Sequence, residues 1–304
     1  MQLQTNSSPG KTGGLKAILF ILFIIAAIVV LALLINHYFL QRSVALKTPM
    51  TILLVGEDSG ISTTQSSETD SVNRSDALVL LFLDPGRSKV SLVSIPGNCQ
   101  VTIPGAGTGP IKDAGAKGGA LLIKQALEAL TNSKINHYLT LNYNGFKRLI
   151  DMVGGVEIEV PFKMYYTDRK GNYITGLEPG RQILNGEKAL LYVRYLDRAT
   201  GEVGRLNRQQ EFIKALAGKA FQPGNILDLV KLYNVFQQYT KTDLTVAEAL
   251  QVAKFLQKMN PGRDLDTYAL PGHPELSLWQ PDLVEIDQLI IKLKPIKGTQ
   301  EDLK

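Results

Sequence analysis

The longest apolar stretch of the chain lies close to its beginning. Residues 17–35 are consecutive apolar residues, and about 20 such residues let a helix cross the hydrocarbon core of a bilayer. Lys11 and Lys16 precede the stretch without any acidic residue, a bias that keeps the N-terminus in the cytoplasm. We therefore expect a cytoplasmic tail at 1–16 and a single transmembrane anchor at 17–40 in the cell membrane, with the bulk of the chain extracytoplasmic. A cleaved signal peptide is the alternative, but its apolar core is usually shorter.

Three further apolar runs predict the first strands of a sheet. They cover residues 51–55, 77–84 and 90–95, and a Pro-Gly turn signal separates the last two. If short connections make these strands antiparallel neighbours, then the end of the first, the start of the second and the end of the third meet at one edge. That edge would collect Asp58, Arg74, Asp76 and the turn at 96–99.

The rest of the chain alternates between helical and strand patterns. Helical spacing predicts helices at 118–132, 143–155, from about 185, 205–221, 225–239 and 245–258. Strand patterns cover 137–142, 156–160 and 265–270. Repeats and a second domain boundary are absent from the sequence, so we expect one domain at 50–291, followed by a loose Lys- and Pro-rich tail at 292–304.

Composition and charge narrow the class of protein. With 44% hydrophobic and 20% charged residues, the chain is typical of globular rather than disordered proteins. The formal net charge of +5 suits anionic lipids, phosphorylated carriers or acidic polymers, although it also serves solubility alone. Cys99 is the single cysteine, so packing without an internal disulfide must hold the fold.

Two groups of side chains are candidates for chemistry. Asp58 and Asp76 would supply the hard oxygen ligands that Mg²⁺ prefers; the alternative is that one starts a turn and the other caps a loop. The second group consists of arginines, whose guanidinium groups bind phosphates in a bidentate manner; the alternative is a solvated basic face. These arginines lie near expected element ends or on one helix face: Arg74, Arg194, Arg205 and Arg208.

Several familiar sites are excluded. The serine-hydrolase motif G-x-S-x-G needs a central serine, but Asp58 occupies that position in 56–60. The three histidines are far apart, so no zinc-binding spacing exists, and the sequence contains neither a P-loop nor a dinucleotide fingerprint. Cys99 has no activating histidine near it, which favours an idle thiol. The basic residues form no recognition-helix motif, so we expect no nucleic-acid partner.

Five segments together resemble the LytR-CpsA-Psr family of cell-envelope proteins. They read ILLVGED, RSDALVLLFLDPGRSKVSLVSIP, YNGFKRLIDMVGGVEIEVPF, LEPGRQILNGEKALLYVRY and GRLNRQQEFIKAL, and the likeness extends from about residue 50 to 260. The resemblance implies an α/β fold of three layers, α/β/α, in which a central mixed sheet and its helices enclose an apolar pocket for a polyprenyl tail. A single N-terminal anchor with an outward domain also agrees with this family.

The resemblance implies a phosphotransferase of cell wall biogenesis. Such a protein moves a glycopolymer, for example teichoic acid, from an undecaprenyl-pyrophosphate carrier to peptidoglycan with the help of Mg²⁺, or of Mn²⁺ as the alternative. Its partners would be the lipid-linked glycopolymer, peptidoglycan and the cell membrane. Arginines and the metal would neutralise the transferring phosphoryl group while a sugar hydroxyl attacks it.

The family's motifs imply roles for individual residues. Asp58 of the G-x-D block and Asp76 of the R-S-D block would be metal ligands. Arg74 of the R-S-D block and Arg194, the first arginine of a Y-V-R-Y-R block, would bind phosphate and act in catalysis. The R-x-x-R-Q-Q block adds three phosphate-binding candidates: Arg205, Arg208 and Gln209.

The chain departs from the family's pattern at this predicted site. Gly97 and Asn98 stand where an I-P-R-D block has arginine and aspartate. Gly60 and Leu196 each replace a further arginine. The phosphate site should therefore carry less charge, and Lys112 in the neighbouring loop is a candidate replacement. The alternative to an enzyme is consequently a non-catalytic polyprenyl-phosphate-binding regulator or scaffold in cell-wall assembly.

Overall fold

The structure, a computed structural model, describes residues 45–58, 74–167, 173–197, 199–220 and 238–294. The chain divides into two compact units, Met1–Ala45 and Leu46–Lys304, and nearly all of the described residues belong to the second unit. The predicted cytoplasmic tail and transmembrane anchor lie outside the described residues. Among the residues that are described, no helix is long and apolar enough to cross a membrane.

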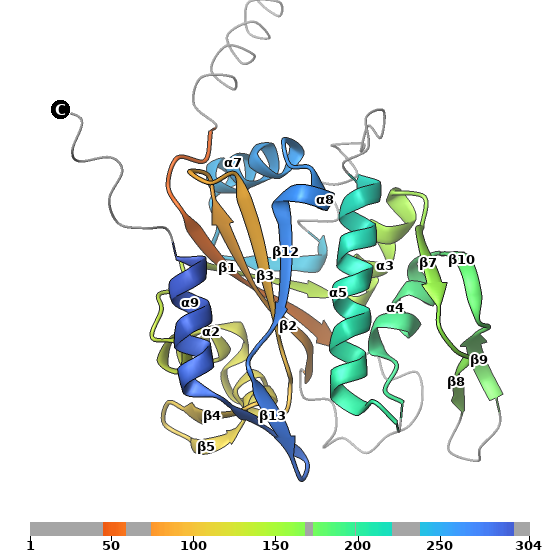
Figure 1. Cartoon of the computed structure of the whole chain (residues 1–304), viewed down its shortest axis with the longest axis horizontal. Helices are drawn as coiled ribbons and strands as arrows, with labels where there is room; N and C mark the ends of the chain where they lie inside the picture. The colour runs from red at the N-terminus through yellow and green to blue at the C-terminus, as the bar shows by residue number, and fades with distance from the viewer. Residues whose placement is uncertain (1–44, 59–73, 168–172, 198, 221–237, 295–304) are drawn as a thin grey trace, which may run out of the picture. The chain divides into compact units, whose positions relative to one another are not determined.

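A six-stranded mixed sheet forms the centre of the second unit (Figure 1). In sheet order its strands are β11 (Thr240–Thr242), β6 (His137–Asn142), β1 (Met50–Asp58), β2 (Arg74–Asp84), β3 (Lys89–Ile95) and β12 (Leu265–Ala269). Antiparallel pairing joins β1 to β2 and β2 to β3, which confirms the predicted meander. β6 runs parallel to β1 and β12 runs parallel to β3, so the sheet is mixed, as predicted.

The sequence of β2 shows why the centre of the sheet reads as a continuous apolar run. Successive side chains of a strand point to opposite faces of the sheet. Leu78, Leu80 and Phe82 pack into one core cluster, whereas Val79 and Leu81 pack into another. A strand that is buried on both faces needs apolar residues at every position, and β2 therefore lies between two layers.

Helices form those two layers, as the predicted α/β/α arrangement requires. The first face carries α2 (Ile111–Thr131) and α9 (Leu283–Leu293); the second carries α5 (Gly201–Ala220), α7 (Val246–Gln257) and the short α8 (Pro261–Asp264) (Figure 1). Ile123 of α2 and Ile286 of α9 are buried in the same cluster as Leu80. Ile213 of α5 and Phe255 of α7 pack against the cluster that contains Leu81.

A third core cluster lies beside the sheet. It is built from α3 (Tyr143–Met152), α4 (Gly186–Arg194), β7 (Val156–Val160), β10 (Gly180–Leu184), β8 (Met164–Thr167), β9 (Tyr173–Leu177) and part of α5. The rings of Tyr192 and Phe212 lie 6.4 Å apart in its interior. A Cβ on Gly186 would come within 2.3 Å of the backbone of Lys147, so glycine allows α4 to begin directly against α3.

Some elements differ from their predicted bounds. The two hairpins β4 (Gln100–Ile103) with β5 (Gly107–Pro110) and β13 (Gly272–Glu275) with β14 (Leu278–Pro281) were not predicted, because four-residue strands carry little periodicity. α2 begins at Ile111 rather than 118 and is kinked at Gly118 and Gly119, whose dihedral angles are not helical. α9 continues to Leu293, into the segment predicted as a tail. The helix predicted at 225–239 lies almost entirely outside the described residues.

Candidate functional site

The predicted meeting of strand ends is present on the side of the sheet where β1, β3 and β6 end and β2 begins. This side is called the site edge, or simply the edge, below. Asp58, the last residue of β1, pairs in Cα register with Arg74, the first residue of β2. Asp76 lies two positions further along β2, where the register shifts: Glu57 pairs with Ser75 and the preceding glycine pairs with Ala77. Asp76 is therefore the extra residue of a β-bulge, a feature that often occurs next to active sites.

β6 brings a helix start to the same edge. Because β6 is parallel to β1, both strands end together, and Asn142 pairs with Glu57. The Asn142 side chain then accepts a hydrogen bond of 2.9 Å from the backbone N–H of Gly145 and caps α3. Tyr143, the first residue of α3, consequently lies at the sheet edge that holds Asp58 and Arg74.

Arg194 reaches this edge from a different part of the chain. It is the last residue of α4 and is exposed, and its guanidinium carbon lies 4.4 Å from the centroid of the Tyr143 ring. That distance is typical of a cation–π contact. The carboxylate of Asp151 in α3 also accepts a bond of 2.8 Å from the N–H of Gly186, the start of α4. The packing of α4 on α3 thus brings Arg194 beside the strand ends.

Two of the predicted phosphate ligands on α5 bind the chain itself. Arg208 is buried and donates hydrogen bonds to the carbonyl of Tyr195 and, over 3.3 Å, to the carboxylate of Asp197. Gln209, also buried, donates to the carbonyl of Val193 over 3.2 Å. Together the two side chains hold the chain on both sides of Arg194, at residues 193, 195 and 197. Their predicted contact with phosphate stays a prediction.

The carboxylate of Asp197 is fixed in its charged form. Hydrogen bonds from Thr200 and the guanidinium of Arg208 lower its pKa to about 2. Its folded pKa lies below the unfolded value of 3.8, so the stabilisation is complete above pH 4 and is lost as the pH falls through about 2. The segment between Arg194 and α5 should therefore keep the hydrogen bond between Asp197 and Arg208 throughout the neutral pH range.

Arg205 differs from Arg208 in its partner and its exposure. It forms an ion pair with Glu202 one turn earlier in α5, and 18% of its side chain is exposed. Its Nε is buried without a partner among the described residues. The exposed fraction leaves Arg205 accessible at the α5 end of the site, where its phosphate-binding role also remains a prediction.

The turn after β3 contributes little charge to this edge. Asn98 donates from its side-chain amide to the carbonyl of Ser277 over 2.9 Å, and its own carbonyl accepts from the N–H of Trp279 over 3.1 Å. Both bonds tie the turn to the β13–β14 hairpin. Cys99 is fully buried, and burial raises the pKa of its thiol to about 12. A neutral thiol is neither a nucleophile nor a metal ligand.

Lys112 lies directly against this turn. Its backbone N–H donates to the carbonyl of Gly97 over 3.0 Å, and the N–H of Ile111 donates to the carbonyl of Cys99 over 2.8 Å. The first turn of α2 is thereby fixed to the end of β3. Lys112 itself is exposed, and its ammonium has no hydrogen bond or ion pair within the described residues.

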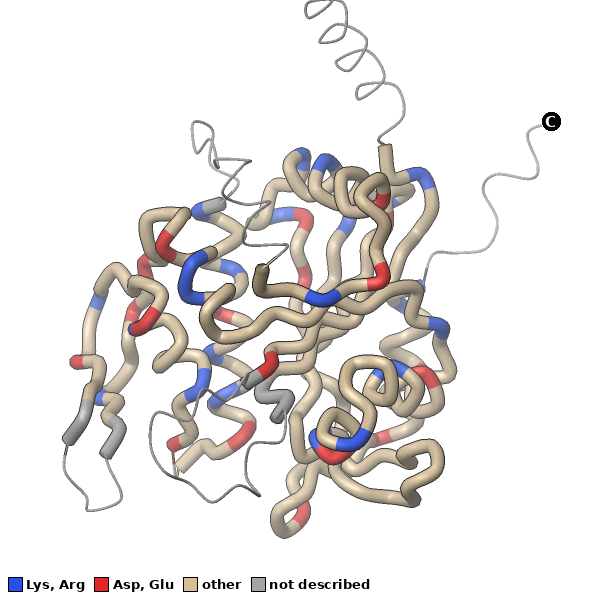
Figure 2. The backbone as a smooth tube through the Cα atoms, turned by 180° about the vertical axis from the view of Figure 1, so that it is seen from behind, with Lys and Arg blue, Asp and Glu red and all other residues tan. Residues whose placement is uncertain are grey.

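Metal ligation by Asp58 and Asp76 depends on side chains that lie outside the described part of the structure. Among the described side chains, no group of three or more His, Cys, Asp or Glu residues is arranged to hold a metal ion. Lys and Arg are interspersed with Asp and Glu along the described chain (Figure 2). The backbone register of the two aspartates is therefore the observation on which the metal prediction depends.

A small apolar pocket lies on the second face of the sheet, between the strands and the helices α5, α7 and α8. Its volume is about 140 Å³. Its lining is entirely apolar: Leu81, Val90, Leu92, Ile213, Ala217, Leu256, Met259, Pro261 and Leu265. This pocket has the apolar chemistry expected of a site for a lipid tail, but the enclosed polyprenyl pocket that the resemblance implies stays a prediction.

Comparison with known proteins identifies the family. The model of the LytR_cpsA_psr family matches residues 36–294, which is most of the 304-residue chain. The chain belongs to the LytR_cpsA_psr family. The resemblance seen in the sequence blocks is thereby confirmed, and the edge formed by Asp58, Arg74 and Asp76 can be considered as a site of this family.

Individual relatives agree with this assignment. The chain is 29% identical over 234 residues to the polyisoprenyl-teichoic acid–peptidoglycan teichoic acid transferase TagV of Bacillus subtilis, covering 74% of this chain and 57% of that protein. The crystal structure of B. subtilis TagV superposes with a TM-score of 0.65 at 26% identity, over 82% of this chain and 99% of that one. The structure of TagT bound to LIIa-WTA has the same fold, with a TM-score of 0.63 at 22% identity over 81% and 90% of the two chains.

Sequence reasoning missed two contacts that shape this site. The first is the contact of Arg194 with the ring of Tyr143. The position of Tyr143 at the edge was foreseeable, because it directly follows a predicted strand, but its contact with Arg194 was not. The bond from Asn98 to Ser277 joins residues 179 positions apart, and nothing in either local sequence indicates it.

Proposed function

We propose that this protein is a membrane-anchored phosphotransferase that moves a glycopolymer from an undecaprenyl-pyrophosphate carrier to peptidoglycan outside the cell membrane. The observation that carries the proposal is the meeting of Asp58, Arg74 and Arg194 at one sheet edge, through the register of β1 with β2 and the stacking of Arg194 on Tyr143. Family membership and the name of the relative TagV support the same reaction.

Mg²⁺ would be held by Asp58 and Asp76. Two carboxylates at the paired ends of β1 and β2 are a suitable donor set, because Mg²⁺ takes one or two carboxylates and completes its shell with water and substrate phosphates. Such a metal supplies charge neutralisation at a phosphoryl group. Mn²⁺, which accepts the same oxygen ligands, is the alternative ion.

The protein's own cations would bind the pyrophosphate of the carrier. We propose that Arg74 and Arg194 contact the transferring phosphoryl group, since guanidinium groups bind phosphate oxygens in pairs, and that Arg205 binds from the α5 end. Arg208 and Gln209 donate to the carbonyls of Tyr195 and Val193, on either side of Arg194. We therefore assign them a positioning role, in which they hold Arg194 against the substrate.

The lipid tail would enter between the sheet and α5. The pocket there is lined only by apolar side chains, which suits a hydrocarbon chain. Its 140 Å³ is below the ~300 to 1,000 Å³ of ordinary ligand pockets. A pocket of this size would admit only part of a tail, so the proposal requires α5 to move away from β2 and β3 when the carrier binds.

The experiment that tests this proposal reconstitutes the reaction. The full chain is incubated with a lipid-pyrophosphate-linked saccharide, Mg²⁺ and a peptidoglycan oligomer. We expect lipid phosphate to be released while the saccharide becomes attached to the oligomer, and we expect EDTA to stop both. Absence of transfer at every Mg²⁺ and Mn²⁺ concentration, with the chain folded, would contradict an enzymatic function.

A second candidate function is a non-catalytic binder of polyprenyl phosphates that acts as a scaffold or regulator in cell-wall assembly. The specific observation in its favour is the neutral turn at Gly97 and Asn98, in which the amide and the backbone carbonyl of Asn98 bond to the β13–β14 hairpin. The same reconstitution separates the two functions. Tight binding of the lipid carrier without turnover would support the binder.

A further inference from the structure

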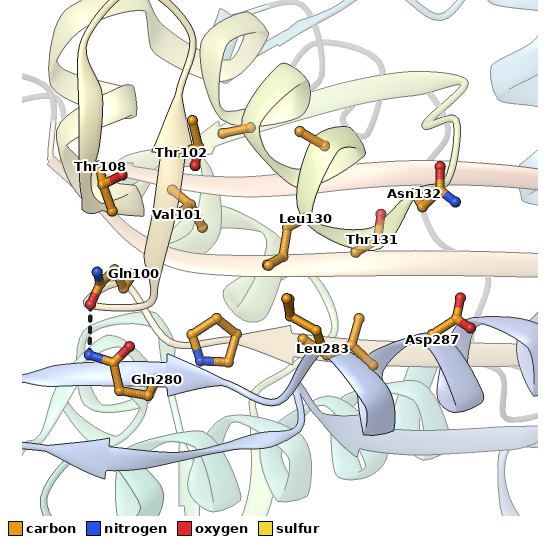
Figure 3. Close-up of a pocket in the computed structure, with 14 residues that line it drawn as sticks. Gln100, Val101, Thr102, Thr108, Leu130, Thr131, Asn132, Gln280, Leu283 and Asp287 are labelled. Atoms are coloured by element: carbon orange, nitrogen blue, oxygen red, sulfur yellow. Dashed lines mark hydrogen bonds between the residues drawn. The ribbon is translucent and has the colours of Figure 1, made fainter.

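A larger pocket lies on the first face of the sheet, across β2 from the apolar one (Figure 3). It opens between the β4–β5 hairpin, the C-terminal half of α2, the end of β14 and the start of α9. Its volume of about 510 Å³ falls within the ~300 to 1,000 Å³ range of pockets that hold small ligands. None of the residues assigned to the phosphate or metal site lines it.

The lining of this pocket combines polar and apolar groups and is almost uncharged. Amides and hydroxyls come from both sides of the opening: Gln100, Thr102, Thr108, Thr131, Asn132 and Gln280. Apolar groups complete the lining: Val101, Ala126, Ala129, Leu130, Pro281, Leu283 and Ile286. Asp287 is the one charged residue in this set, and the set contains neither lysine nor arginine.

Several of these polar groups are ordered without any ligand. The side-chain amide of Gln280 donates to the side-chain carbonyl of Gln100 over 2.6 Å, and this bond joins the two sides of the opening (Figure 3). Thr102 and Thr108 are cross-strand partners in the β4–β5 hairpin, and both are exposed. Because these groups are already ordered, a ligand that bonds to them loses less conformational entropy on binding.

The chemistry of the lining selects one class of ligand. A phosphate or carboxylate would find no cation within the lining, and the ammonium of Lys294 beside it already donates to the carbonyl of Asn132 over 3.3 Å. A lipid tail would cover polar groups of the lining, such as Thr102 and Thr108, without giving them hydrogen bonds. A sugar ring fits both parts, because its hydroxyls exchange hydrogen bonds with amides and hydroxyls while its C–H face covers apolar groups. Resting on the proposed function, we propose that this pocket binds an uncharged saccharide ring of one of the two glycan substrates.

The path of the chain connects this pocket to the site edge. β4 begins at Gln100, immediately after the turn that follows β3, and the hairpin of β13 and β14 follows the end of the parallel strand β12. A short parallel backbone pairing of Cys99 with Trp279 joins the segment after β3 to the hairpin after β12. Two of the four elements around the pocket, β4 and β14, are therefore connected by short segments to the edge where Asp58 and Arg74 lie. A glycan that reacts at that edge could reach this pocket with another of its sugar rings.

The single tryptophan provides a local reporter for this proposal. Trp279 is buried and precedes Gln280 of the lining. The fluorescence of the full chain is titrated with chitotetraose, maltotetraose and inorganic phosphate. We expect a saturable change with at least one of the two oligosaccharides and none with phosphate. If neither oligosaccharide changed the fluorescence, the proposal would be overturned.

Variants show whether the saccharide occupies this pocket. Gln100→Ala removes one hydrogen-bonding side chain and should weaken oligosaccharide binding about 3- to 10-fold. Ala129→Phe, at an exposed position of the lining, should obstruct the pocket and reduce binding at least as much. Gln125→Ala, at an exposed position of α2 outside the lining, is the matched control and should bind like the native chain. Unchanged affinity in both pocket variants, with native circular dichroism, would overturn the assignment.

The transfer assay distinguishes the two possible sources of the saccharide. In Gln100→Ala, a higher KM for the peptidoglycan oligomer alone would assign the pocket to the acceptor, and a higher KM for the lipid-linked donor alone would assign it to the glycopolymer. Unchanged KM for both would contradict a substrate subsite. Transfer without any oligosaccharide binding would refute this inference alone, whereas oligosaccharide binding without transfer would refute only the proposed enzyme.

Discussion

The two sides of the site edge differ in how they treat charge. On the side of β1, β2 and α4, the chain brings together Asp58, Arg74, Asp76 and Arg194. On the side of β3, the Gly97–Asn98 turn is neutral: Asn98 bonds to the β13–β14 hairpin, and the carbonyl of Gly97 accepts from the backbone of Lys112. The site edge is thus divided into a charged half, at β1, β2 and α4, and an uncharged half, at the turn after β3.

This difference shows how a turn at the proposed site can be held without charge. Asn98 keeps the turn in place through Ser277 and Trp279, so a charged pair at Gly97 and Asn98, as the resemblance implies for the family, is not needed to form the turn. The variants below test how unequal the two halves are.

The largest effect is expected at the proposed metal ligands. Asp58→Ala and Asp76→Ala should each abolish the Mg²⁺ dependence of transfer and lower its rate by at least about 10²-fold, the scale of a lost transition-state contact. The measurement is the transfer rate against Mg²⁺ concentration. Asp266→Ala, which removes an ion pair with Lys89 elsewhere in the sheet, is the control and should leave the dependence intact. Native Mg²⁺ dependence in either site variant would remove that residue from the metal site.

Arg194 should come next. Arg194→Ala should lower the transfer rate about 10²-fold, while Arg194→Lys should keep part of it because lysine retains the charge but not the bidentate geometry. Tyr143→Leu removes the ring under the guanidinium and should cost less, about 3- to 10-fold. Arg181→Ala, which breaks an exposed ion pair with Glu157, serves as the control. If Arg194→Ala behaved like this control, the charged half would not include α4.

Lys112 tests whether the uncharged half receives a cation from its neighbour. Lys112→Ala should reduce transfer, and binding of the lipid pyrophosphate, about 2- to 5-fold, since an exposed charge pair is worth about 1 kcal/mol or less. The exposed Lys117, in the same first segment of α2, gives the control variant Lys117→Ala. Equal effects of the two variants would show that only the general charge of α2 matters.

The smallest effect on activity should come from Asn98. Asn98→Ala should lower the free energy of unfolding by about 1 kcal/mol, because the hydrogen bond to Ser277 is lost. It should change the transfer rate less than twofold. Chemical denaturation of the full chain measures the first quantity. A loss of transfer with native stability would mean that the neutral turn contacts the substrate after all.

Much of the sheet was predictable because its information is local. The meander, and with it the shared edge of Asp58 and Arg74, follows from three apolar runs. The contact of Arg194 with Tyr143 was not predictable from either segment, since it depends on how α4 packs on α3. The pocket that contains Gln100 and Gln280 is assembled from segments 180 residues apart, and short hairpins form its walls, so no periodic pattern predicts it.

The late position of β12 has a consequence for biosynthesis. Its partner β3 comes about 175 residues earlier in the chain, as the pairing of Leu265 with Val90 records. Until β12 has been synthesised, the outer edge of β3 exposes unpaired backbone groups, which other strands can join. Such distant pairing is also slow. Nascent or truncated chains that end before residue 265 should therefore depend on chaperones and aggregate through β3 when these are absent.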